Sequence, residues 1–103
     1  MITSGELAID PERYEVTVAG EPVDLTYLEF NALRYLAELN GRIATYDGLA
    51  AALWSEDATR TRRRLAVLIS RIRSKLGAAG AERIRTVRQV GYRLTEPPQA
   101  IPG

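Results

Sequence analysis

The sequence lacks cysteine and histidine, and its 103 residues include a single tryptophan, phenylalanine and methionine. Without cysteine there is no disulfide framework. Without cysteine or histidine, the usual zinc ligand sets and the nucleophile arrangements that depend on histidine are unavailable. No residue pattern identifies a catalytic group either. We therefore expect a protein that is not an enzyme and that uses no cofactor or metal ion.

Long hydrophobic runs are also absent. No apolar run approaches the roughly 20 residues that a membrane-spanning helix needs, and the N-terminus lacks the basic and then apolar pattern of a signal peptide. We therefore expect a cytoplasmic protein with no membrane partner. Hydrophobic residues make up 46% of the sequence and charged residues 26%, which is typical of one folded domain of this length.

Basic residues are scarce in the first part of the chain, and acidic residues are scarce in the second. Residues 1–59 contain three basic and eleven acidic residues, whereas residues 60–93 contain eleven basic residues and one acidic residue, Glu82. The formal net charge of +1 conceals this separation. We expect the folded domain to have one basic side, which would suit an anionic partner.

The strongest helical period, at residues 61–76, coincides with the densest positive charge. At about 100° per residue, the apolar side chains of this segment share one arc, which we expect to be buried. The arc consists of Leu65, Leu68, Ile69, Ile72 and Leu76. The seven basic residues from Arg60 to Lys75 have no acidic residue among them, although a solvated helix usually mixes both signs.

The opposite face of this predicted helix is small at its centre and basic at its edges. It consists of Arg63, Val67, Ser70 and Ser74, flanked by Ala66 and Arg73 on one side and by Arg64 and Arg71 on the other. Such a face predicts contact with an anion, and we interpret the segment as a helix that enters a groove of DNA. The alternative is a solvated basic face without a partner, because charge runs commonly have none.

The first part of the chain has the alternating pattern of a small antiparallel β-meander. Strands are predicted around Leu7–Ile9 and Tyr14–Val18, with a third short strand at Val23–Leu25 after a turn at residues 19–22. Residues 1–5 carry no pattern, and we expect them to be disordered or part of a linker.

Three helices are predicted after the meander. Thr26 and Glu29 have the spacing of a capping box, and the buried helix that they open should run to about Leu39 and end at Asn40-Gly41. Thr45 is the expected N-cap of a second helix, Tyr46–Trp54. A polar loop at residues 55–59 joins it to the basic helix, which gives the helix-turn-helix pattern.

The end of the chain predicts a β-hairpin. A strand at Arg83–Arg88, a turn at residues 89–91 and a returning strand at Tyr92–Leu94 would form a wing beside the basic helix. The predicted fold is therefore α+β, a winged helix-turn-helix with an N-terminal antiparallel β-meander, three helices and a C-terminal β-hairpin wing. We expect this domain to span residues 6–96 and residues 97–103 to form a disordered tail.

The order of these elements and four local motifs resemble the winged-helix effector domain of OmpR/PhoB-type response regulators. The motifs are Leu25-Thr26-x-x-Glu29-Phe30, Leu49-x-x-x-Leu53-Trp54, Arg63 followed by Val67-x-Ile69-x-Arg71-Ile72-Arg73-x-Lys75-Leu76-Gly77, and Thr86-Val87-Arg88-x-x-Gly91-Tyr92-Arg93. No single motif is decisive. Together they cover nearly the whole predicted domain.

The resemblance implies a DNA-binding module of a bacterial transcription regulator. In that family the third helix reads the major groove and the wing arginine reaches the minor groove. The positions implied or predicted to contact DNA are Arg63, Arg64, Val67, Ser70, Arg71, Arg73, Ser74, Thr86 and Arg88. The resemblance also implies RNA polymerase as a partner of the loop Ser55, Glu56, Asp57, Ala58 and Thr59, and a second copy of the domain in tandem on DNA.

Four positions depart from the family pattern. Family members commonly have Asp and His where this chain has Ala66 and Leu68, often Arg at Ser70, and Gly at Gln89. If the wing still turns tightly, we expect Gly91 to take the positive φ angle. These departures support a second hypothesis, a protein-interaction module whose basic face binds an acidic protein. RNA binding is a third, although no aromatic pair is placed to stack bases on a sheet.

Overall fold

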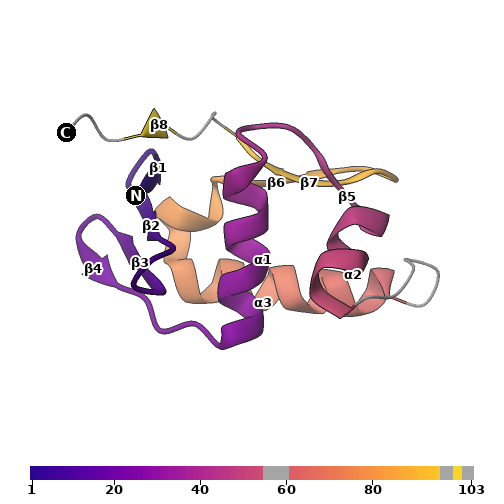
Figure 1. The fold of residues 1–103 in the computed structure, drawn as a ribbon, viewed down its shortest axis with the longest axis horizontal. Helices are drawn as coiled ribbons and strands as arrows, with labels where there is room; N and C mark the ends of the chain where they lie inside the picture. Colours follow the sequence, from indigo (N-terminus) through magenta and orange to yellow (C-terminus); the bar gives the residue numbers. More distant parts are fainter. Residues whose placement is uncertain (55–60, 96–98, 101–103) are drawn as a thin grey trace.

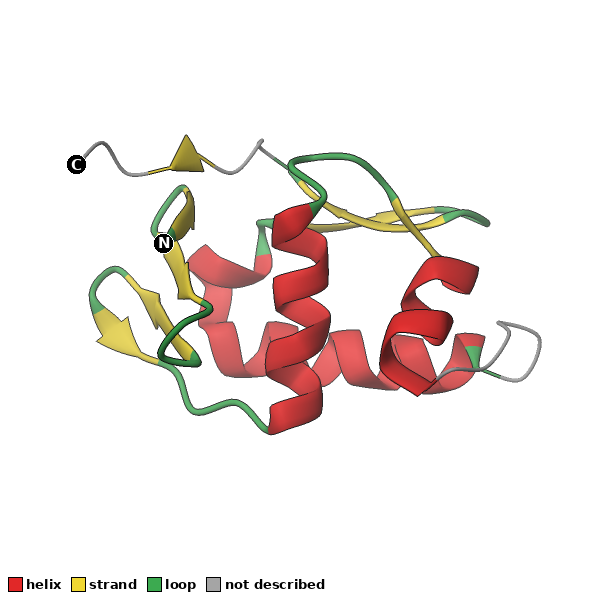
Figure 2. Cartoon of the chain, in the orientation of Figure 1, coloured by secondary structure: helices red, strands yellow, loops and turns green. Residues whose placement is uncertain are grey.

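The computed structural model describes residues 1–54, 61–95 and 99–100. Within these residues, three helices pack together and two antiparallel sheets flank them (Figure 1). The strands lie at two edges of the helical part, one sheet beside the N-terminus and the other at the C-terminal hairpin (Figure 2). The prediction of an α+β winged helix-turn-helix is confirmed. None of the helices described is long and apolar enough to cross a membrane.

The N-terminal sheet has the strand order β4-β3-β2-β1-β8, with every neighbouring pair antiparallel. Its strands are β1 (Ile2–Ser4), β2 (Leu7–Asp10), β3 (Glu15–Val18), β4 (Glu21–Pro22) and β8 (Gln99–Ala100). The predicted alternation is confirmed in β2, where Leu7 and Ile9 are buried, and in β3, where Val16 is buried.

Three expectations for the chain ends and the meander are corrected. Residues 1–5 are not without structure, because Ile2–Ser4 pair with β2 and their backbone amides gain ladder partners. In the predicted tail, residues 97–103, Gln99–Ala100 pair with β1. The third strand is Glu21–Pro22, before the predicted Val23–Leu25, because positive φ angles at residues 19–20 (52° and 81°) close a tighter hairpin turn.

Helix α1 (Tyr27–Glu38) begins with the predicted capping box. Thr26 Oγ1 accepts a hydrogen bond from the Glu29 amide at 3.1 Å, and Glu29 Oε1 accepts one from the Thr26 amide at 2.9 Å. The helix ends before Asn40 and Gly41, whose φ angles of 56° and 88° do not continue it. Its buried residues, which include Phe30, make α1 the central helix of the core.

Helix α2 (Tyr46–Trp54) is capped by Thr45, whose Oγ1 accepts from the Gly48 amide at 3.0 Å, as predicted. Just before it, β5 (Ala44–Thr45) pairs with a strand of the C-terminal hairpin. A two-residue strand has no periodicity of its own, which is why the sequence does not reveal it.

Helix α3 (Arg62–Ala81) passes behind α1 and contacts both other helices (Figure 1). All five residues of its predicted apolar arc are buried, between 0% and 6% exposed. Gly77, with φ 74° and ψ −179°, interrupts the helix immediately after Leu76, as predicted. Helical structure resumes after Gly77 and continues to Ala81.

The second sheet has the order β5-β7-β6 and contains the wing hairpin, β6 (Ile84–Val87) and β7 (Gly91–Leu94). The expectation that Gly91 takes a positive φ is wrong, because Gln89 takes it instead, at 64°. Glycine is needed at position 91 for a different reason. A Cβ there would lie 1.9 Å from the Ala44 carbonyl oxygen, so only glycine lets β5 approach β7.

Candidate nucleic-acid interface

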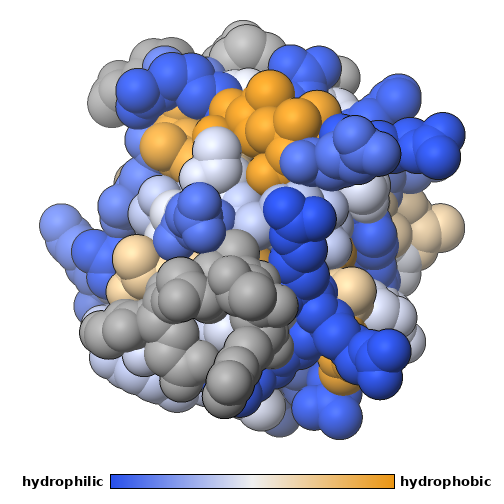
Figure 3. Space-filling view, turned by 90° about the vertical axis from the view of Figure 1, so that its right-hand side faces the viewer, coloured by the Kyte–Doolittle hydropathy of each residue, from blue (hydrophilic) through white to orange (hydrophobic). Residues whose placement is uncertain are grey.

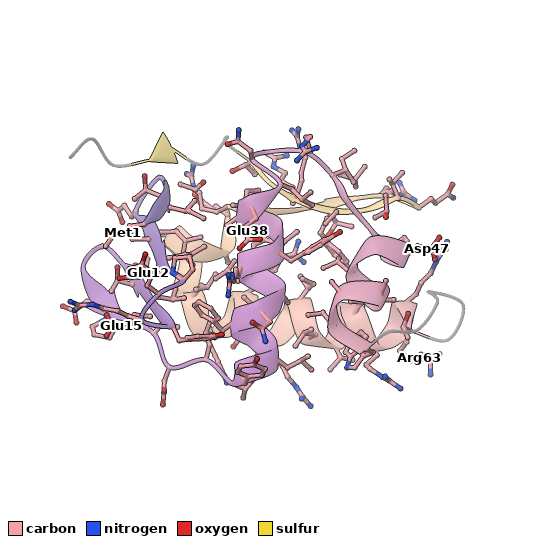
Figure 4. The ribbon with its side chains drawn as sticks, viewed as in Figure 1. Met1, Glu12, Glu15, Glu38, Asp47 and Arg63 are labelled. Atoms are coloured by element: carbon pink, nitrogen blue, oxygen red, sulfur yellow. The ribbon has the colours of Figure 1, made fainter. Side chains whose placement is uncertain are left out.

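The outward face of α3 is exposed along its length. Arg63, Val67, Ser70 and Ser74 are all exposed, and Val67 retains 45% of its accessible surface while its neighbour Leu68 retains 6%. Arg64 and Arg71 are also exposed. Figure 4 shows Arg63 pointing away from the body of the molecule. The helical phase inferred from the sequence is therefore correct, and these predicted contact residues face solvent.

Two arginines in the first turn of α3 lie over aromatic rings of α2. The Arg62 guanidinium carbon is 4.5 Å from the centre of the Tyr46 ring, and that of Arg64 is 4.9 Å from the centre of the Trp54 ring. Cation–π contacts at exposed sites contribute about 0.5 to 1 kcal/mol and restrict the rotamers of the arginine. Arg62 was not among the predicted DNA contacts. The sequence did contain a signal for it, because the predicted second helix has an aromatic residue at each end, Tyr46 and Trp54, and a run of arginines follows it.

Arg73 and Thr86, both predicted to contact DNA, contact one another. Arg73 Nη2 donates to Thr86 Oγ1 at 3.0 Å and to the Ile84 carbonyl oxygen at 2.9 Å. The Arg73 guanidinium carbon also lies 5.9 Å from the centre of the Tyr92 ring. Burial raises the pKa of the Tyr92 phenol. The guanidinium therefore joins α3 to the wing.

The wing carries further positive charge. Arg85 and Arg93 are register partners across β6 and β7, and both are exposed. Arg88 is exposed in the turn between the strands, which a hydrogen bond from the Val90 amide to the Val87 carbonyl closes at 3.0 Å. The predicted strand ended at Arg88, with the turn at residues 89–91, whereas β6 ends at Val87 and Arg88 lies in the turn.

The end of the molecule with the wing turn and the start of α3 includes Arg62, Arg63, Arg64 and Arg88. At the end with the wing turn, α2 and the start of α3, most of the described side chains in view are hydrophilic (Figure 3). Figure 4 shows Glu12 and Glu15, on the N-terminal sheet, at the end opposite Arg63. The first turn of α3, which carries Arg63, thus lies at the end opposite these two glutamates, whereas the C-terminal part of α3 contacts β3 and Asp47 of α2 lies at the same end as Arg63. The predicted polymerase-contact loop, Ser55–Thr59, lies outside the described residues.

Comparisons with known proteins agree with this arrangement. The sensory transduction protein RegX3 of Mycolicibacterium smegmatis is 35% identical over 96 residues, which are 91% of this chain and 42% of RegX3. The alkaline phosphatase synthesis transcriptional regulatory protein PhoP of Bacillus subtilis is 37% identical over 98 residues, 93% of this chain and 41% of PhoP. The chain thus spans about two-fifths of the length of these curated relatives.

Two solved DNA-binding domains are similar to this chain over nearly their whole length. The RstA DNA-binding domain of Klebsiella pneumoniae, crystallised in complex with the RstA box, is 38% identical with a TM-score of 0.78, and the match covers 90% of this chain and 95% of that one. The DNA-binding domain of CpxR from E. coli is 25% identical with a TM-score of 0.81, covering 94% and 98%. Residues 20–94 match the family described as "Transcriptional regulatory protein, C terminal". The chain therefore belongs to this family of C-terminal transcriptional regulatory domains, of the OmpR/PhoB type.

Proposed function

We propose that this chain binds double-stranded DNA in a sequence-specific manner, as the effector domain of a transcription regulator. The observation that carries the proposal is the division of α3 into two faces. One face is buried in the core, and the other presents arginines and small side chains to solvent with no acidic residue among them. An exposed helix of this kind fits the major groove, which is about 12 Å wide.

The contacts on α3 divide into base readers and phosphate contacts. We assign base reading to Arg63, Val67, Ser70 and Arg71, because they project from the exposed arc or its edge. Arg62 and Arg64 are assigned to phosphates, since the rings beneath them hold the guanidinium groups at the flanks of the helix start.

The wing supplies the second part of the interface. Arg88, exposed in the turn, enters the adjacent minor groove and favours A·T-rich flanks, where a narrow groove has a deeper negative potential. Contact with RNA polymerase through residues 55–59 and tandem binding of a second copy belong to the same proposal, and both rest on the family resemblance.

Titration with fluorescent duplex DNA at low salt tests this function directly. We expect binding to a random duplex, and tighter binding to duplexes selected from a random pool. Arg63→Ala should weaken binding at least about fivefold, and about 30-fold at the middle of the range of about 1 to 3 kcal/mol for one base contact. Arg13→Ala is the matched control, because it removes the same charge from an exposed position on the N-terminal sheet side. It should leave affinity unchanged.

The possible outcomes separate the candidate functions. Absence of binding to any duplex at low salt would reject DNA binding and favour the module that binds an acidic protein. Equal losses in Arg63→Ala and Arg13→Ala would reject the assigned face. Among the selected sequences, a direct repeat would support tandem binding, whereas a palindrome would imply a two-fold dimer.

A further inference from the structure

Arg73 is the residue through which α3 contacts the outer part of the wing. Its Nη2 atom donates to two successive acceptors along β6, the Ile84 carbonyl oxygen at 2.9 Å and Thr86 Oγ1 at 3.0 Å. Its guanidinium also faces the ring of Tyr92, the register partner of Thr86. One side chain thus contacts both strands of the hairpin.

The Ile84 carbonyl is an acceptor that the hairpin itself leaves open. In the described sheet, β6 is an edge strand next to β7 alone. The Thr95 amide donates to the Arg83 carbonyl at 2.7 Å, so the Arg83 carbonyl faces β7 and the Ile84 carbonyl, one residue on, faces away from it. Arg73 satisfies this outward carbonyl and thereby covers part of the strand edge.

The contact at Thr86 lies farther along the hairpin than the register pair Ile84 and Leu94, which are buried and fix the base of the wing. On β7, Tyr92 lies opposite Thr86, and that strand is held separately by its pairing with β5 and by the hydrogen bond from the Tyr46 amide to the Val90 carbonyl at 3.1 Å. Beyond Thr86 the next residues are partly or fully exposed and form the turn that carries Arg88. A hydrogen bond at Thr86 therefore restrains the outer part of the wing more than the same bond at its base would.

We propose that Arg73 is a positioning residue that fixes the angle of the wing relative to α3, so that Arg88 enters the minor groove while α3 occupies the major groove. The proposal rests on the proposed function and deepens it. Arg73 acts through the wing, and it contributes to recognition of the sequence that flanks the site. Holding the two elements in one arrangement before binding removes the ordering cost that a loose wing would add.

A double-mutant cycle with Arg88 tests this role. If Arg73 positions the wing, the effects of Arg88→Ala and Arg73→Ala on the binding free energy should be strongly coupled. If the two residues contact DNA independently, their effects should be additive. On a selected duplex with an A·T-rich flank, we expect Arg88→Ala to weaken wild-type binding about tenfold. In the Arg73→Ala background the same change should weaken binding less than about threefold, because the wing is already misplaced.

Arg71→Ala is the matched control. It removes the same charge from the same helix, and Arg71 is exposed. In the Arg71→Ala background, Arg88→Ala should retain its full tenfold effect, about the same as in the wild type. If Arg88→Ala keeps its full tenfold effect in the Arg73→Ala background, the proposal is overturned. It is also overturned if Arg88→Ala has no effect in the wild type, because the wing would then not reach DNA.

Thr86→Val provides a second variant that leaves the charge of Arg73 in place. It keeps a β-branched side chain on the strand but removes the hydroxyl acceptor, so it should reduce the effect of Arg88→Ala in the same direction. If the effects of Thr86→Val and Arg88→Ala are strictly additive, Thr86 is at most a direct DNA contact and the hydroxyl does not position the wing. That result would contradict the proposal even if Arg73→Ala failed to fold.

Amide hydrogen exchange without DNA separates failure of this proposal from failure of the proposed function. The Val90 amide, bonded to the Val87 carbonyl at 3.0 Å, reports on the wing turn. We expect its exchange to be at least about tenfold faster in Arg73→Ala than in wild type or Arg71→Ala. Unchanged exchange would overturn the positioning role whether or not the chain binds DNA, whereas faster exchange in a chain that binds no duplex would reject only the proposed function.

Discussion

Lys75 Nζ lies 2.7 Å from Glu29 Oε1, joining the last turn of α3 before Gly77 to the first turn of α1 across 46 positions of sequence. The same carboxylate oxygen accepts the Thr26 amide at 2.9 Å. Glu29 is 3% exposed, whereas the Lys75 side chain is 40% exposed. One buried carboxylate therefore both caps α1 and holds the helix that carries the basic face.

Stability should depend on the ionisation of Glu29. Burial opposes ionisation, but the hydrogen bonds from Lys75 and the Thr26 amide outweigh it and lower the pKa of Glu29. Because the folded pKa is the lower one, the contribution to stability is present above the unfolded value, about 4.3, and is lost as pH falls through the folded pKa. Glu29→Gln should cost about 1 to 2 kcal/mol at pH 7.

Urea unfolding at pH 7 and at successively lower pH values measures this effect. The difference in unfolding free energy between wild type and Glu29→Gln should shrink as the pH falls below about 4. Glu38→Gln is the control on the same helix, since Glu38 pairs with Arg34 at 2.6 Å but is exposed. It should cost no more than about 0.5 kcal/mol. A Glu29→Gln difference that is independent of pH would contradict the ion-pair account.

Adjacent residues of α3 should respond in opposite ways to truncation. Leu68 is 6% exposed, so Leu68→Ala should lower the unfolding free energy by about 2 to 5 kcal/mol. Val67 is 45% exposed, so Val67→Ala should change stability by less than about 0.5 kcal/mol and weaken DNA binding instead. Thermal unfolding and DNA titration of both variants test this. Equal stability losses would show that the buried face is assigned wrongly.

The helical phase of α3 was predictable because burial repeats with the period of the helix. The five apolar positions of its arc differ enough from the exposed arginines that no other phase buries them. The same reasoning found the capping box of α1, since its signal is local and spans only Thr26 to Glu29. Features set by neighbours distant in sequence were missed. β5 and β8 exist because β7 and β1, which are distant from them in sequence, pair with them.

The site was predictable to the same extent. The sequence identified which α3 side chains face solvent, but not which of them already have protein partners. Arg73 was predicted to contact DNA, yet its hydrogen bonds go to β6, 11 and 13 positions along the chain. Arg62 was missed, because its ring partner Tyr46 belongs to α2. Such contacts depend on how the elements pack, which no helical period encodes.

Arg63 and Arg71 should read bases and not only phosphates. Each can donate two parallel hydrogen bonds to guanine O6 and N7, and both are exposed on α3. Replacing either with alanine should cost about 1 to 3 kcal/mol on the selected site and relax the preference at one base pair. Repeating the sequence selection with each variant measures this. An equal loss on selected and random duplexes would identify that arginine as a phosphate contact.

The two unusual positions of the wing should differ in their tolerance to change. Gly91→Ala would place a Cβ 1.9 Å from the Ala44 carbonyl oxygen, so we expect a loss of about 2 to 4 kcal/mol of stability. Gln89→Gly removes the backbone strain of a non-glycine residue at φ 64°, which stabilises the fold, but it also raises the entropy of the unfolded chain, which destabilises the fold. The two effects partly cancel. The stability of this variant should stay within about 0.5 kcal/mol of wild type and its DNA affinity within about threefold. A tolerated Gly91→Ala would contradict the close approach of β5 and β7.

The salt dependence of binding to duplex DNA tests the central claim most directly, because counterion release measures how many phosphates the basic face neutralises. If the arginines of α3 and the wing engage about five phosphates per monomer, log K against log salt concentration should have a slope near −4 to −5. Arg62→Ala combined with Arg64→Ala should make the slope shallower by about 2. A flat salt response would contradict the assignment of this face to DNA.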